Sequence, residues 1–221
     1  MVCYIRDGTM AVDLRVEEYT VGEVMTNCFF IVNVDTNEML IVDPGAEGAD
    51  LAARVKSRGY KPVAVLLTHG HFDHAGGVAD FIKAFPVPVY AHEAERETLE
   101  SPMMNLSGMW TRHGQQFRAD IFVKEGDVLK LAGFTIRVIF TPGHTPGGCC
   151  YYFEENKVLA AGDTLFHGSI GRTDFPGGSA RTLIDGIKNK LYDLPGDTEV
   201  LPGHNARTTI GYERQYNPFT R

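Results

Sequence analysis

A dense group of histidine and aspartate residues follows an apolar run in the first third of the chain. Residues 63–67 read Val-Ala-Val-Leu-Leu, and residues 68–74 read Thr-His-Gly-His-Phe-Asp-His. The apolar run predicts a buried strand. Alternate residues of an extended segment point the same way, so His69, His71 and Asp73 can share one side. His74 then turns away as the chain enters a helix. This segment therefore presents possible ligands in two directions.

These residue types are those that bind borderline cations. Imidazole nitrogen and carboxylate oxygen bind zinc and similar cations at about 2.0–2.2 Å. One loop with two ligand directions is enough to begin two adjacent metal sites. The alternative is a polar loop whose histidines only form hydrogen bonds. So dense a cluster favours a metal centre, because a cation offsets the crowding of these groups.

Three later apolar runs also end close to a residue that can bind a metal. These runs end at positions 140, 161 and 201, and the residues that follow are His144, Asp163 and His204. Many α/β enzymes build their sites from loops at strand ends, which a rigid sheet holds in place. The alternative is that His144 and His204 are core histidines satisfied by hydrogen bonds. The repeated placement favours one site assembled from four strand ends.

Seven candidate ligands are enough for two divalent cations. We predict that His69, His71 and His144 form a first group of ligands. Asp73, His74 and His204 are predicted to form a second group, and Asp163 is predicted to bridge the two. Two metals about 3.5–4 Å apart can hold a water between them and lower its pKa toward neutrality. Such a site supplies hydroxide beside a Lewis acid and needs no side-chain nucleophile. We expect zinc, with iron or manganese as alternatives.

Apolar runs and turn residues predict alternating strands and helices. Strands are expected at residues 28–32, 39–42, 63–67, 87–91, 134–140, 149–153, 158–161 and 199–201. Helices are expected before Gly59, after residue 74, over 93–99, and from a cap at Ser179 to residue 191. The helix after residue 74 is expected to bury Ala75, Val78, Ala79 and Ile82. Segment 101–118 is predicted to be a long loop or broken helix beside a pocket.

Composition limits the classes of partner. The 221 residues carry a formal charge of −7, which argues against a large nucleic-acid surface. No apolar run approaches the roughly 20 residues that span a bilayer. Residues 1–7 show no basic region before an apolar core, so no secretory signal is predicted. We therefore expect one cytoplasmic domain over residues 1–221, without nucleic-acid or membrane partners and with its oligomeric state open.

The cysteines and the remaining histidines are expected to play lesser roles. The four cysteines, at positions 3, 28, 149 and 150, lack Cys-x-x-Cys spacing and are expected to be reduced core thiols, with a redox or metal role as the alternative. His92 is expected at a helix start and His113 in the irregular segment, both at the surface. His167 either lines the pocket near Asp163 or belongs to a simple loop.

Residues 68–74, with His144, Asp163 and His204 in that order, resemble the complete ligand set of the metallo-β-lactamase superfamily. The resemblance spans residues 43–204. Residues 162–166 (Gly-Asp-Thr-Leu-Phe) and 171–176 (Gly-Arg-Thr-Asp-Phe-Pro) resemble the short glyoxalase II-like hydrolases within it. The resemblance implies an α/β fold, a four-layer αββα sandwich of two similar halves with metals at one edge between the sheets.

The same resemblance implies hydrolysis of an S-acyl thioester, typically S-lactoylglutathione. One metal would polarise the thioester carbonyl while a bridging hydroxide attacks, and Asp73 would bind the other metal and orient the hydroxide. Glyoxalase II enzymes also carry a C-terminal helical extension whose basic residues hold the glutathione carboxylate. The residues after His204 do not match that extension, so the expected partner is a small thioester whose thiol half is open.

Three further positions resemble residues that support ligands or substrate. Asp43 either orients a liganding imidazole or forms a turn. Arg172 and Asp174 align with a lysine and a tyrosine of the family loop. Arg172 either faces an anionic substrate or pairs with Asp174. With His167, these positions complete the predicted site.

Other members of the superfamily offer alternative functions. A persulfide dioxygenase shares the fold and much of the 171–175 loop, and would use one Fe(II) held by two histidines and an aspartate. Many β-lactamases place cysteine where Asp163 stands, and flavodiiron proteins commonly have glutamate at the position of His71. From a different class, a non-catalytic metal-binding or sensor protein would keep the fold without turnover.

Overall fold

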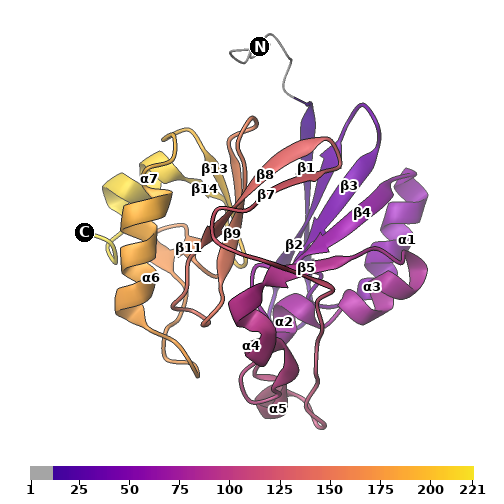
Figure 1. Cartoon of the computed structure of the whole chain (residues 1–221), viewed down its shortest axis with the longest axis horizontal. Helices are drawn as coiled ribbons and strands as arrows, with labels where there is room; N and C mark the ends of the chain where they lie inside the picture. The colour runs from indigo at the N-terminus through magenta and orange to yellow at the C-terminus, as the bar shows by residue number, and fades with distance from the viewer. Residues whose placement is uncertain (1–11) are drawn as a thin grey trace.

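The computed structural model describes residues 12–221, so Cys3 and the segment 1–7 lie outside the described part. Two six-stranded sheets face each other, and helices cover the outer face of each sheet (Figure 1). The first sheet runs in the order β1 (Leu14–Val21), β2 (Thr26–Asn33), β3 (Glu38–Val42), β4 (Lys61–Leu66), β5 (Val89–His92) and β6 (Ile121–Val123). The second sheet runs in the order β14 (Thr208–Thr209), β13 (Glu199–Pro202), β10 (Val158–Gly162), β9 (Cys149–Phe153), β8 (Phe134–Phe140) and β7 (Val128–Leu131).

Short helices connect the strands. They are α1 (Gly48–Arg58), α2 (Phe72–Ala75), α3 (Val78–Ala84), the 3₁₀ turn η1 (Glu93–Glu95), α4 (Arg96–Glu100), α5 (Ser107–Trp110), α6 (Ala180–Gly186), the π-helical turn η2 (Ile187–Leu191) and α7 (Ile210–Tyr216). A small hairpin of β11 (Leu165–Phe166) and β12 (Ser169–Ile170) follows β10. Within residues 12–221, no helix combines the length and apolar character needed to cross a membrane.

The first sheet begins as antiparallel strands and continues as parallel ones. β2 and β3 form the predicted antiparallel hairpin, with Phe29 opposite Val42. β3, β4, β5 and β6 are then parallel, since helical segments connect each to the next. Parallel strands finish at the same edge of a sheet, so the residues after β3 and β4 lie side by side. This edge therefore receives Asp43 and segment 68–74.

Alternation along the strands separates three apolar layers. In the fully buried strand β2, Phe29 and Ile31 pack between the two sheets, whereas Phe30 and Val32 pack against the helices outside. A strand buried on both faces reads as a continuous apolar run. On the outer face of the second sheet, Leu183 joins a third apolar layer with residues of η2 and α7. These three apolar layers lie between four structural layers, namely helices, sheet, sheet and helices, and this confirms the predicted four-layer αββα sandwich.

The predicted helix after residue 74 is only partly correct. Gly76 and Gly77 separate α2 from α3, and α3 buries Val78 and Phe81, while Ala79 is exposed. A Cβ atom on Gly77 would lie 2.6 Å from the carbonyl oxygen of Pro44. The backbone N–H of Gly77 donates to the same carbonyl oxygen, at 2.8 Å, instead of to a carbonyl of α2. The helix is interrupted at this contact, and the new helical segment starts with a different face toward the core.

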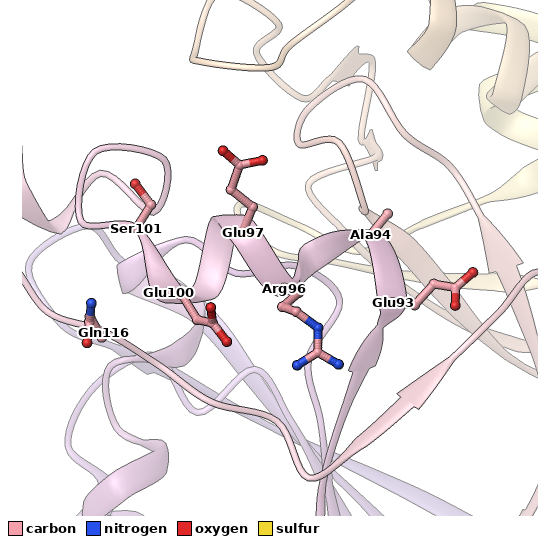
Figure 2. Close-up of a pocket in the computed structure, with 7 residues that line it drawn as sticks. All are labelled: Glu93, Ala94, Arg96, Glu97, Glu100, Ser101 and Gln116. Atoms are coloured by element: carbon pink, nitrogen blue, oxygen red, sulfur yellow. The ribbon is translucent and has the colours of Figure 1, made fainter.

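The predictions for the other histidines and for segment 101–118 had mixed outcomes. His92 caps η1 as expected, but it is buried, and its ring stacks on Phe140 at 4.1 Å, so the expected surface position is wrong. His113 is exposed. Segment 101–118 contains only the single turn α5, and Ser101 and Gln116 border a pocket of about 540 Å³ beside η1 and α4 (Figure 2).

The cysteines that the structure describes are free and buried. Cys149 and Cys150 begin β9, as the sequence predicted, and Cys28 lies in β2. Burial raises the pKa of Cys150 to about 11. A buried thiol with a raised pKa is chemically inert, which fits core thiols.

Candidate metal centre

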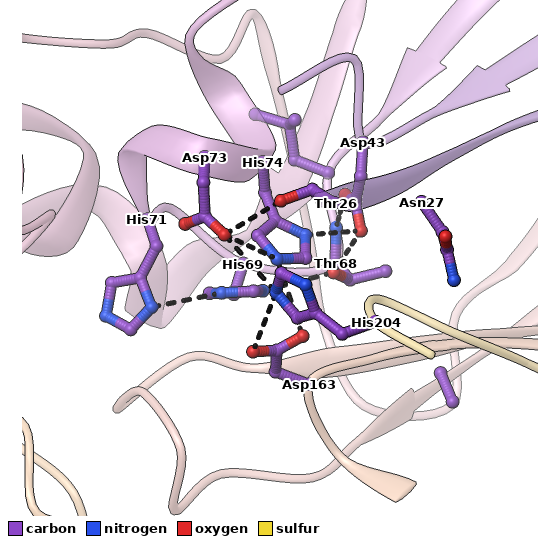
Figure 3. A network of polar contacts seen from close by, with 12 residues as sticks. Thr26, Asn27, Asp43, Thr68, His69, His71, Asp73, His74, Asp163 and His204 are labelled. Carbon is purple, nitrogen blue, oxygen red and sulfur yellow. Dashed lines mark hydrogen bonds and ion pairs between the residues drawn. The ribbon is translucent and has the colours of Figure 1, made fainter. Parts of the chain in front are cut away.

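Loops at the ends of the strands bring all seven predicted ligands together. They come from the segment after β4, from α2 and from the loops after β8, β10 and β13, and they are His69, His71, Asp73, His74, His144, Asp163 and His204. Figure 3 shows the predicted ligands other than His144 converging from the segment after β4, from α2 and from the loops after β10 and β13. A hydrogen bond from the backbone N–H of Cys149 to the carbonyl of Thr68 joins the two sheets beside the cluster. The rigid sheets therefore hold side chains that lie far apart in the sequence.

The first predicted group is a triangle of imidazole nitrogens. Nδ1 of His71 lies 3.1 Å from Nε2 of His69 and 3.0 Å from Nε2 of His144. Nδ1 of His144 lies 2.7 Å from the carbonyl oxygen of Arg172, so it carries the proton and Nε2 keeps its lone pair. Three ring nitrogens that face one point can all bind one cation placed there, instead of forming hydrogen bonds with one another.

The second predicted group lies beside the first. Oδ2 of Asp73 is 3.5 Å from Nε2 of His74 and 3.3 Å from Nε2 of His204. Asp163 touches both groups, since its carboxylate oxygens lie 3.4 Å from His74 and 3.4 Å from His144. This arrangement matches two adjacent cation positions with one shared carboxylate.

The donor atoms fit divalent cations. Nε2 of His74 and Oδ1 of Asp163 are buried and have no hydrogen-bond partner among residues 12–221. Buried polar atoms are nearly always satisfied, so such atoms facing one another indicate a site for an ion. Nitrogen and carboxylate donors suit zinc, iron and manganese. The residues therefore fit the predicted pair of metals.

Burial and neighbouring charges set the protonation states that metal ligands need at five of the seven positions, whereas the neighbouring aspartates, acting against burial, raise the pKa values of His74 and His204. Burial, assisted by the other imidazoles, lowers the pKa of His71 to about 3, and it also lowers the pKa values of His69 and His144. Burial alone would raise the pKa of Asp163, but the surrounding histidines lower it to about 2, and they likewise hold the pKa of Asp73 below its usual range. At neutral pH these five groups are ready to bind a cation without losing protons.

Two residues that the sequence analysis missed support the second group. The hydroxyl of Thr26 donates to Oδ2 of Asp73 at 2.9 Å. The side-chain amide of Asn27 donates to the carbonyls of Pro202 and Asn205, on either side of the His204 loop position. The signal available in the sequence was a pair of polar residues directly before the apolar run of residues 28–32.

The predicted supporting positions have different surroundings. Arg172 forms a bidentate ion pair with Asp174, at 3.0 and 2.8 Å, and both side chains are largely exposed. Arg172 therefore reaches the cluster through its carbonyl oxygen rather than its guanidinium. His167 is exposed and stacks on Tyr212 at 4.8 Å, so the structure does not place it among the seven ligands.

Sequence comparison assigns most of the chain to a known family. The family model described as the metallo-beta-lactamase superfamily matches residues 21–204. A probable metallo-hydrolase YqgX of Bacillus subtilis is 39% identical over 200 residues, which cover 90% of this chain and 94% of that protein. A hydroxyacylglutathione hydrolase GloC of Haemophilus influenzae is 37% identical over 208 residues, which cover 93% and 98%.

Solved structures show the same fold. BLEG-1, a B3 metallo-beta-lactamase, is 40% identical with a TM-score of 0.89, over 93% of this chain and 99% of that one. TTHA1623, solved in a di-iron-bound form, is 35% identical with a TM-score of 0.81, over 92% of this chain and 100% of that one. The similarity extends over nearly the whole of both structures.

Proposed function

This chain belongs to the metallo-β-lactamase superfamily, and we propose that it is a metal-dependent hydrolase that cleaves an S-acyl thioester such as S-lactoylglutathione. The observation that carries the proposal is the intact cluster of seven ligands, in which Asp163 touches both groups. The relative named hydroxyacylglutathione hydrolase, at 37% identity, supports the thioester as substrate.

The side chains of the cluster would have different roles. When bound, two divalent cations would supply a Lewis acid and a water of lowered pKa. His69, His71 and His144 would hold the first cation, Asp73, His74 and His204 the second, and Asp163 would bridge them. Asp73 is ionised and held by the Thr26 hydroxyl, so its carboxylate can orient the attacking group and accept its hydrogen bond.

Aromatic side chains beside the cluster suit an organic acyl group. The ring of Phe175 lies edge-on to His71, at 5.5 Å, and near His144, at 6.0 Å. Phe72 follows His71 in the chain and stacks with the exposed Trp110 at 6.3 Å. The nearby Arg172 is already paired with Asp174. These surfaces favour a substrate with apolar parts over a polyanion.

We propose zinc as the metal, because imidazole and carboxylate donors suit it. Iron and manganese are the alternatives to measure, and the di-iron form of TTHA1623 shows that a similar protein binds iron. We also propose that residues 1–221 form one cytoplasmic domain without nucleic-acid or membrane partners. The formal charge of −7 argues against a large nucleic-acid surface.

The test combines metal analysis with parallel assays. The full chain is purified without chelators, its metals are quantified, and hydrolysis of S-lactoylglutathione is measured beside oxygen uptake with glutathione persulfide. We expect two metals per chain and thioester cleavage without oxygen uptake. One iron per chain with oxygen consumption would instead support a persulfide dioxygenase. No turnover of thioesters, lactones or phosphoesters by metal-replete protein would support a non-catalytic metal-binding protein.

β-Lactam hydrolysis is a second candidate function, because BLEG-1 is 40% identical and superposes over 93% of this chain. A chromogenic cephalosporin therefore belongs in the same set of assays. Faster cleavage of the β-lactam than of every thioester tested would favour this candidate.

A further inference from the structure

Glu95 is a fully buried carboxylate outside the ligand cluster. Its side chain is 0% exposed, whereas its neighbours Glu93, Arg96 and Glu97 are exposed and line the outer pocket shown in Figure 2. None of the ion pairs found among residues 12–221 includes Glu95. Burial raises the pKa of this carboxyl group. A buried carboxylate is unfavourable unless it is hydrogen-bonded, so its partners are informative.

The partners of Glu95 belong to two loops that carry predicted ligands. Oε2 accepts a hydrogen bond from the backbone N–H of Gly70, at 2.8 Å. Oε1 accepts from the hydroxyl of Thr145, at 2.5 Å, and from the backbone N–H of Gly147, at 2.7 Å. Gly70 stands between His69 and His71, and Thr145 follows His144. One carboxylate therefore joins the two loops that supply the three histidines of the first group.

Two glycines permit this close contact. A Cβ atom on Gly70 would lie 2.9 Å from Oε2 of Glu95. A Cβ atom on Gly147 would lie 2.4 Å from the backbone nitrogen of Glu95. Side chains at either position would push the loops away from Glu95. The fit of three separate segments thus depends on Glu95 and on two residues without side chains.

We infer that Glu95 is a positioning residue that holds the His69–His71 loop against the His144 loop and so sets the geometry of the three-histidine group. The inference rests on the proposed metal centre. The second group has separate supports, since Asp43 contacts His74 and Thr26 contacts Asp73. Loss of Glu95 should therefore weaken one cation position and spare the other.

Cobalt-loaded full chain offers a direct test. The two bound ions are removed by increasing chelator concentration, and the visible absorption of Co²⁺ and the metal content are followed together. Glu95→Gln keeps the size of the side chain but turns an amide N–H toward a donor in one of the loops. Outer supports of metal ligands typically change affinity by about 10–100-fold, and we expect a loss of this size for one of the two ions.

Single-site backgrounds identify which ion is affected. In a His204→Ala background, which retains the three-histidine group, Glu95→Gln should weaken the remaining ion, whereas in a His144→Ala background it should leave the remaining ion unchanged. Gly70→Ala should reproduce the effect of Glu95→Gln. Glu97→Gln is the matched control, because Glu97 lies on the exposed side of the same segment.

The outcomes separate the inference from the proposed function. Wild-type chain that binds no Co²⁺ would overturn the metal centre itself. Wild-type chain that binds two ions, with Glu95→Gln folded by circular dichroism and retaining both at wild-type affinity, would overturn the role of Glu95 alone. An equal loss of both ions would also contradict it, because a general packing defect would act on both groups.

Discussion

Oδ2 of Asp43 lies 2.9 Å from Nδ1 of His74, and both side chains are buried. The same carboxylate accepts hydrogen bonds from the backbone N–H and the hydroxyl of Thr68, at 2.8 and 2.6 Å. Asp43 follows β3 and Thr68 follows β4, so one carboxylate ties two parallel strand ends to a predicted ligand. It directs Nε2 of His74 toward Asp73 and Asp163.

Asp43→Asn is expected to weaken metal binding at the second group by about 10–100-fold, because an amide cannot accept from all three donors. The measurement is metal retention by the full chain against a chelator. Asp50→Asn is the control, since Asp50 is exposed in the first turn of α1. Wild-type retention in Asp43→Asn would show that Asp43 serves only the turn.

Asp73→Ala is expected to lower thioesterase turnover by at least about 10²-fold, because it removes both a predicted ligand and the group that orients the attack. The fold should survive, since Asp73 is partly exposed at the start of α2. Steady-state kinetics and circular dichroism check the two parts. Asp80→Ala is the matched control, because Asp80 is an exposed helix residue paired with Lys83. Near-normal turnover in Asp73→Ala would count against the proposed mechanism.

Gly203→Ala is expected to disturb the metal centre from the side of β13. A Cβ atom there would lie 2.2 Å from Oδ1 of Asp163 and 2.7 Å from Cε1 of His74. We expect a loss of bound metal and of turnover of at least about tenfold. Gly186→Ala is the control, because its Cβ would make only ordinary contacts, at 3.7 Å or more. Equal metal content in the two variants would contradict the crowding argument.

Metal-free protein is expected to lose stability as the pH falls from about 6.5 toward 3. Burial holds the pKa of His71 at about 3, against an ordinary value of 6.5. Between these values the unfolded chain binds a proton that the folded chain does not, so the free energy of unfolding decreases with falling pH, by up to a few kcal/mol. Urea unfolding of the chelated chain across this range measures the slope.

His71→Gln should make that slope shallower, because it removes one of the titrating groups, while His69 and His144, whose pKa values burial also lowers, remain. His74 has the opposite effect on the pH dependence of stability, and it acts at pH values above 6.5. Although burial alone would lower it, the neighbouring aspartates raise the pKa of His74, so its contribution is present below the ordinary value of 6.5 and is lost as the pH rises beyond it. A slope in His71→Gln equal to that of the wild type would contradict the assignment.

Much of the architecture could be predicted because its signals are local. The apolar run before residue 68 became β4, the turn after β2 formed the hairpin, and Ser179 caps α6 through the N–H of Thr182. The helix after α2 could not be predicted correctly, because its break depends on the Pro44 loop packing against Gly77. Strands and caps follow from neighbouring residues, whereas a break imposed from outside does not.

Supporting residues of the site were harder to predict than the proposed ligands. Thr26 bonds to Asp73 in α2, and Asn27 bonds to residues at the end of β13 and just after it, all far away in the sequence. Glu95 is one of several acidic residues between 93 and 100, and only the orientation of η1 and α4 turns it inward. Its partner Gly147 lies 52 residues away.

The sequence by itself determined the identity and order of the seven predicted ligands, because donor chemistry belongs to each side chain and apolar runs mark the strand ends that carry them. Only the tertiary structure decided which nitrogen of each ring faces the centre, how far apart the two groups stand and which buried groups hold them. Those properties arise from contacts between the two sheets and their loops, and such contacts exist only once distant parts of the chain have packed together.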